Sequence, residues 1–132
     1  MKIEVSIGEV MDKLSILAIK RKKITATEKL ANIEKEYQFL AAALAKEGIE
    51  TDSDEYRRLE AVNAKLWDIE DRIRLKEAAS EFDKDFIALA RSVYFNNDDR
   101  ANVKREINEK YGSELVEEKQ YATYRFSKKM EG

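Results

Sequence analysis

Cationic and amide side chains gather in one stretch of the chain, residues 91–105. This stretch, RSVYFNNDDRANVKR, contains an Asn-Asn-Asp run that favours a break between two helices. A break would place the free backbone N–H groups of a helix N-terminus beside the cations, and such N-termini bind anions readily. Arginine adds a bidentate grip on phosphate or carboxylate. The candidate anion-binding residues are Arg91, Asn97, Arg100 and Lys104.

Aspartates support simpler alternatives to an anion site and to a metal site. Asp98 and Asp99 carry the carboxylates that a helix N-terminus prefers, so the chain itself can take the place of an external anion. Asp68 and Asp71 share one helix face and could hold magnesium with acids from another helix. Cations follow that pair immediately, however, and salt-bridged helix surface explains the pattern better. We therefore expect no metal and no cofactor.

The single tryptophan, Trp67, lies off the apolar seam of a predicted helix and among polar residues. A tryptophan on a polar face is typical of a contact, because its side chain buries a large area. Packing within the chain, a subunit interface and a ligand platform all remain open for it. The first predicted helix is also apolar around much of its circumference, which favours burial on more than one side. The candidate interface residues are Met11, Ile16, Ile19, Trp67, Glu70, Asp71 and Arg74.

Composition excludes several classes of protein. The chain has 132 residues, and we expect a single helical domain with a body of residues 1–112 and a tail of residues 113–132. Lys and Arg number 25 against 27 Asp and Glu, which argues against nucleic-acid binding. The absence of cysteine and histidine removes thiol catalysis, histidine relays and nitrogen or sulfur zinc sites. Without a basic leader or an apolar run of membrane-spanning length, we expect a cytoplasmic protein with no membrane span.

Apolar periodicity predicts an all-α protein of four to five helices. The first runs from near Ile7 to about Lys23, with Ser6 and Glu9 forming a capping box. The next two helices each carry a seam of five apolar residues, and a connection of about six residues separates them. We therefore expect a long antiparallel hairpin resembling a coiled coil. The two seams are Leu30, Ile33, Tyr37, Leu40 and Leu44, then Leu59, Val62, Leu66, Ile69 and Ile73.

Capping residues and glycines set the remaining boundaries. The expected caps are Thr25 or Thr27, Asp52 or Ser53, Ser80 or Asp83, and Asn97 or Asp98, while Gly48 and Gly112 end helices. Residues 2–7 alternate between apolar and polar types, and residues 121–126 are rich in aromatics. These two segments can pair as a short two-stranded β ribbon, provided that it lies on the helices.

Four stretches of the chain resemble a family of short, uncharacterised helical proteins from bacteria and phages. They are residues 5–17 (VSIGEVMDKLSIL), 66–74 (LWDIEDRIR), 90–108 with its segments ARSVY, NDDRA and KREIN, and 112–119 (GSELVEEK). The resemblance covers nearly the whole chain and implies a setting near genes for sugar transfer and surface polysaccharide. It implies no activity and no functional residue. It does indicate that the polar motifs of the first, third and later helices can converge.

Two functions are consistent with these residues. The first is a non-enzymatic interaction module that self-associates as a homodimer, or binds an unidentified protein, through an apolar helix face. The rival is a protein or enzyme that binds a small anionic ligand, a phosphorylated sugar or nucleotide, through Arg91, Arg100 and Lys104. The sequence favours the first function and leaves catalysis open.

Overall fold

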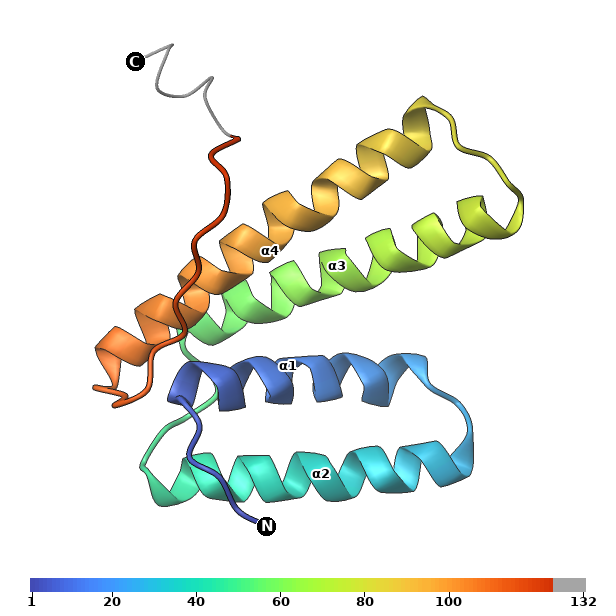
Figure 1. The fold of residues 1–132 in the computed structure, drawn as a ribbon. Coiled ribbons are helices and arrows are strands. Elements are labelled where there is room, and N and C mark those ends of the chain that lie inside the picture. Colours follow the sequence, from blue (N-terminus) through green and yellow to red (C-terminus); the bar gives the residue numbers. More distant parts are fainter. Residues whose placement is uncertain (125–132) are drawn as a thin grey trace.

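The computed structural model describes residues 1–124, and in that part of the chain it contains four α-helices and no strand (Figure 1). The helices are α1 (Ile7–Lys23), α2 (Thr27–Lys46), α3 (Asp54–Ala78) and α4 (Lys84–Lys110). α1 and α2 form one antiparallel pair, and α3 and α4 form another. α1 contacts the three other helices and is therefore the centre of the arrangement. The prediction of an all-α protein is confirmed.

Side chains cap three of the four helices at their N-termini. Ser6, Ser53 and Asp83 each accept a hydrogen bond from the backbone N–H three residues later, at 3.1, 3.1 and 2.9 Å. Each bond satisfies one of the N–H groups that a helix leaves free at its start. α2 begins without a side-chain cap, so the predicted cap at Thr25 or Thr27 is wrong.

The core lies where α1 meets α3 and α4. Met11 and Leu14 on α1, Leu59 on α3 and Ile107 on α4 are all fully buried. Leu44 at the end of α2 joins the same cluster. Burial of one such side chain contributes about 1.5–3 kcal/mol, so this cluster fixes the positions of all four helices.

The expected hairpin between the second and third helices is wrong. Within residues 1–124, no Cα atom of α2 lies within 8 Å of a Cα atom of α3, because each of the two helices packs on α1. The seam of α2 reaches the core through Leu44 and that of α3 through Leu59, and both residues belong to the buried cluster that contains Met11 and Leu14. α1 carries apolar residues on two sides, so it separates two seams that could otherwise pair with each other.

α4 runs without interruption through residues 96–98, so the expected break between a fourth and a fifth helix is wrong. Asn96 Nδ2 donates to the carbonyl oxygen of Ser92 at 2.8 Å, and Asn97 Oδ1 accepts from Arg100 Nη1 at 3.4 Å. Both amides therefore find partners within the helix and do not end it. Buried apolar residues on each side of this run hold α4 in place.

The expected β ribbon is also wrong for the residues that the structure describes. The N-terminal segment runs from α1 towards α2, whereas the C-terminal segment, residues 113–124, passes along α4 (Figure 1). The Tyr124 ring packs against the rings of Tyr94 and Phe95, with centroid distances of 5.0 and 5.4 Å. Aromatic contact with α4 therefore replaces strand pairing. Arg125 and Phe126, the last residues of the expected strand, lie outside the described residues.

Across residues 1–124, none of the helices combines the length and the apolar character that crossing a membrane requires.

Candidate functional site

Three polar contacts join the N-terminal half of α1 to the C-terminal half of α4. The two helices run in opposite directions here, so residues later in α1 contact residues earlier in α4. We call this arrangement the polar ladder, and its contacts are Gly8 with Asn108, Glu9 with Lys104, and Asp12 with Arg100. The α4 members are spaced four residues apart, which places them on one helix face.

The innermost contact of the ladder is a buried ion pair. Asp12 is 1% exposed, and its carboxylate accepts hydrogen bonds from Arg100 Nε, at 2.8 Å, and from Arg100 Nη2. Asn63 on α3 donates to Asp12 Oδ1 at 2.9 Å and to Ser15 Oγ at 2.8 Å. The hydrogen bond to Asp12 raises the pKa of Arg100. Removing one partner of such a pair leaves a buried charge uncompensated, so the pair holds α1, α3 and α4 in register.

Lys104 forms the middle contact and bridges two carboxylates. Its Nζ lies 2.7 Å from Glu9 Oε2 and 2.8 Å from Glu117 Oε2. Burial alone would lower the pKa of Lys104, but the hydrogen bonds to Glu117 and Glu9 outweigh it and raise the pKa. The same contact lowers the pKa of Glu117. Both groups are therefore charged at neutral pH, and the cation fixes the C-terminal segment to α4.

Gly8 and Asn108 form the outermost contact, with 2.7 Å between Gly8 N and Asn108 Oδ1. The two backbones approach closely here, because a Cβ on Gly8 would lie 2.6 Å from the carbonyl oxygen of Lys104. One residue earlier, Ile7 N donates to Ser113 Oγ at 3.2 Å. The first N–H groups of α1 are thus satisfied from α4 and from the C-terminal segment.

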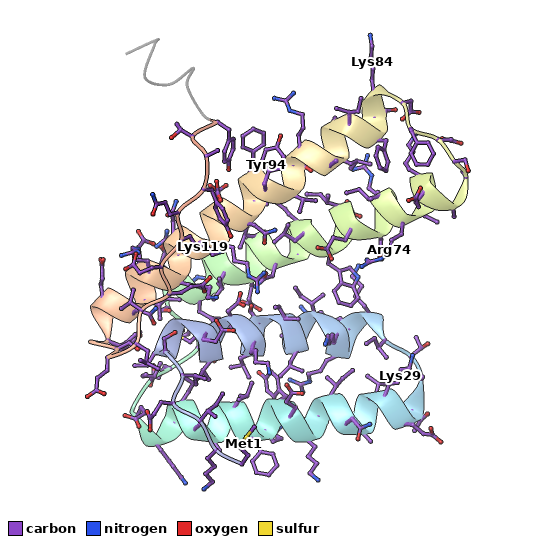
Figure 2. The ribbon with its side chains drawn as sticks, viewed as in Figure 1. Met1, Lys29, Arg74, Lys84, Tyr94 and Lys119 are labelled. Atoms are coloured by element: carbon purple, nitrogen blue, oxygen red, sulfur yellow. The ribbon has the colours of Figure 1, made fainter. Side chains whose placement is uncertain are left out.

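Three adjoining cavities lie between α4 and the C-terminal segment, with volumes of about 240, 390 and 610 Å³. We call them together the α4 cleft. Lys119 lines all three, and Lys104 lines the two smaller ones. The largest is lined by Tyr94, Tyr121 and Tyr124. Figure 2 shows Lys119 where the C-terminal segment passes over α4. One end of the cleft is thus charged, and the other is aromatic.

Three of the four residues predicted to bind an anion come together in this cleft. Asn97, Arg100 and Lys104 line the cavity of about 240 Å³. Arg91 does not line any of the three cavities; its guanidinium lies 5.9 Å from the centroid of the Phe95 ring, at the outer limit of a cation–π contact. The expected helix N-terminus is not present, because α4 is continuous there. The side chains alone therefore form the charged end of the cleft.

The predicted interface residues lie elsewhere. Met11 is fully buried in the core, while Ile16, Ile19 and Trp67 are half-buried. The other three are exposed on α3: Glu70, Asp71 and Arg74. Figure 2 places Arg74 well away from Lys119, and none of the predicted interface residues lines any of the three cavities of the α4 cleft.

Several members of the site are not evident from residue type and spacing. They are Glu9, which the pattern assigns only to a capping box, and Asn63, Glu117 and Lys119. The available signal is the spacing of Gly8 and Asp12, four residues apart in the first helix. No group of three or more acidic side chains that could hold a metal ion is present among residues 1–124.

The fold and the site together define a class: an all-helical protein of two packed helix pairs, with a polar ladder and a cleft beneath its C-terminal segment. The chain belongs to DUF6165, a family of unknown function, whose model matches residues 1–129. No curated protein and no solved structure matches the chain.

Proposed function

We propose that the α4 cleft binds a small phosphorylated molecule, such as a sugar phosphate or a nucleotide. The observation that carries this proposal is the composition of the cleft. Arg100, Lys104 and Lys119 line one end together with the carboxylates of Glu9 and Glu117, and three tyrosines line the other. Ligand sites combine a mainly apolar wall with a few polar groups that fix orientation, and the cleft has both.

The charged end of the cleft is suited to bind a phosphate group because its hydrogen-bond donors come from separate parts of the chain. Lys104 comes from α4 and Lys119 from the C-terminal segment, and both line the cavity of about 240 Å³. Arg100 lines it too, and Asp12 engages its Nε and Nη2 while Nη1 faces Asn97. Arginine has five N–H donors, so the buried pair leaves donors for a ligand oxygen. The ion pair thus holds the guanidinium in position without using all of its donors.

The aromatic end of the cleft is suited to bind a ring of the ligand. The cavity of about 610 Å³ is lined by Tyr94, Tyr121 and Tyr124 together with Val93. A tyrosine supplies a flat apolar face and a hydroxyl, which suits a sugar or a nucleobase. The resemblance described above implies a setting in surface-polysaccharide synthesis, so sugar phosphates and nucleotide sugars are the first ligands to test. The proposal is one of binding and assigns no reaction.

A thermal-shift screen tests the proposal with glucose 1-phosphate, UDP-glucose and inorganic pyrophosphate, with and without magnesium. A ligand at 100 times its dissociation constant stabilises the fold by about 2.7 kcal/mol, so a binder raises Tm measurably. Lys119→Ala should weaken binding about tenfold, since a hydrogen bond to a charged group contributes about 1.5–3 kcal/mol.

The matched control is Lys29→Ala, which removes the same charge from α2, far from the cleft (Figure 2). It should leave affinity unchanged. A screen that is flat at millimolar concentrations of all three probes would refute the proposal, as would equal losses in the two variants.

Self-association is a second candidate function, and a different observation favours it. Three large apolar side chains are exposed where α3 turns into α4: Leu75 at 70%, Phe82 at 58% and Ile87 at 55%. Trp67 and Arg74, two of the predicted interface residues, precede Leu75 on α3. A surface of this kind is typical of a protein contact.

Light scattering at micromolar concentration tests this candidate, and the expected result is the mass of a homodimer. Leu75→Glu should shift the protein to monomer because it places a charge in the contact. Phe39→Glu is the control, since Phe39 is equally exposed, at 68%, but lies on α2. A wild-type chain that is monomeric throughout would rule out self-association.

A further inference from the structure

Glu117 occupies the centre of the charged end of the α4 cleft. Its Oε2 lies 2.8 Å from Lys104 Nζ, and its Oε1 lies 3.3 Å from Lys119 Nζ. Each oxygen of one carboxylate is therefore held by a different cation. Two cations that converge on the two oxygens of one anionic group form the arrangement that binds a phosphate or carboxylate.

Other contacts hold the C-terminal segment on both sides of Glu117. Ser113 accepts from the backbone of α1, and Tyr124 packs on the aromatic residues of α4. The Glu117 side chain itself is 42% exposed. It can therefore turn towards solvent while the segment stays in place. Glu9 remains on Lys104 in either case, which keeps the ammonium group positioned.

We propose that Glu117 is a built-in competitor that fills the subsite for the anionic group of the ligand. This inference depends on the proposed function and identifies its anionic subsite as the space between Lys104 Nζ and Lys119 Nζ. A phosphate group bound there displaces the Glu117 carboxylate and takes over both cations. The affinity then depends on how much more strongly the ligand anion binds the two lysines than the Glu117 carboxylate does. Anions that bind the lysines weakly, such as singly charged ones, do not displace Glu117.

Isothermal titration with inorganic pyrophosphate tests the competition in wild type, Glu117→Gln and Glu114→Gln. Glutamine keeps the size of Glu117 and removes its charge, so pyrophosphate should bind Glu117→Gln about tenfold more tightly than wild type. Glu114→Gln is the matched control, because Glu114 is exposed in the same segment and carries the same charge. It should bind as wild type does. A circular-dichroism melt of each variant confirms that the fold is kept.

The outcomes separate this inference from the proposed function. If wild type binds and Glu117→Gln binds equally or more weakly, the competitor role is overturned while the proposed function stands. If both glutamine variants tighten by the same factor, net charge is responsible and the competitor role is again overturned. If pyrophosphate, UDP-glucose and glucose 1-phosphate bind to none of the three proteins, the proposed function fails and the inference fails with it.

Discussion

Replacing Asp12 by alanine is expected to lower the free energy of unfolding by about 3 kcal/mol. The substitution leaves the Arg100 guanidinium, whose side chain is 28% exposed, without its carboxylate partner. It also removes the acceptor of one Asn63 hydrogen bond. Breaking a buried pair costs about 3–5 kcal/mol, and the partial exposure of Arg100 places this case at the lower end. Urea denaturation of the purified variant measures the change.

Lys13→Ala is the control for this prediction, since Lys13 adjoins Asp12 on α1 but is exposed and pairs with Glu36 at the surface. It should change stability by about 0.5 kcal/mol or less. The double variant Asp12→Ala with Arg100→Ala should recover part of the loss, because no charge is then left unpaired. A loss of less than about 1 kcal/mol for Asp12→Ala would show that the pair does not hold the helices together.

Gly8→Ala is expected to destabilise the protein by about 2 kcal/mol, although alanine is ordinarily the better helix former. The new Cβ would lie 2.6 Å from the backbone carbonyl oxygen of Lys104 and 2.8 Å from Asn108 Oδ1. A backbone atom cannot rotate aside as a side chain does, so α1 and α4 must move apart. The hydrogen bond between Gly8 N and Asn108 lengthens with that movement. Thermal and urea unfolding measure the loss.

The double variant Gly8→Ala with Asn108→Ala identifies the cause. Removing the amide relieves the contact with Asn108 Oδ1 but not the contact with the Lys104 carbonyl. The double variant should therefore remain at least as unstable as Gly8→Ala. Full recovery of stability would mean that the side chain, and not the approach of the two backbones, excludes a larger residue at position 8.

The starts of α1, α3 and α4 could be predicted from the sequence because they depend on neighbouring residues. The caps at Ser6, Ser53 and Asp83 each join a side chain to a backbone N–H only three residues away. The left-handed residues Gly48 and Gly112, with φ of 71° and 62°, are a local signal of the same kind. Side-chain caps and left-handed glycines can be recognised from a few neighbouring residues, whatever the tertiary structure.

Helix pairing could not be predicted in the same way. The apolar seams of α2 and α3 match in length and spacing, as if they could pair directly. Periodicity alone does not reveal that a third helix lies between them. The broad apolar surface of α1 was recognised and indicated burial on more than one side. The consequence is that both seams pack on α1, and it depends on the tertiary structure, which brings Met11, Leu44 and Leu59 into one buried cluster.

The candidate site was only partly predictable for a related reason. Arg100 and Lys104 were identified from residue type, but their partners Asp12 and Glu9 lie 88 and 95 positions earlier in the chain. The expected helix break would have let a helix N-terminus supply part of the positive charge. Instead, Asn96 donates to a carbonyl oxygen one turn earlier, and the helix continues. Side chains of α4, and not a helix N-terminus, thus supply the cations.

The ion pairs Asp12–Arg100 and Glu117–Lys104 have different expected roles. Asp12 is buried and held by three donors, so it fixes the geometry of Arg100. Glu117 is partly exposed and lies on a segment without helix or strand, so its contact with Lys104 can exchange with an external anion at lower cost. A buried Asp12–Arg100 pair beside an exchangeable Glu117–Lys104 pair is the physical basis of the proposed binding site.

Amide chemical-shift mapping tests the central proposal most directly. Inorganic pyrophosphate is titrated into the ¹⁵N-labelled chain, and saturable shifts should concentrate at Ala101, Lys104, Glu117 and Lys119 around the charged end of the cleft. The basic run at the end of α1, residues 20–23, provides an internal comparison because it carries four cations outside the cleft. Shifts centred on residues 20–23, or none at millimolar pyrophosphate, would contradict an anion site at Lys104 and Lys119.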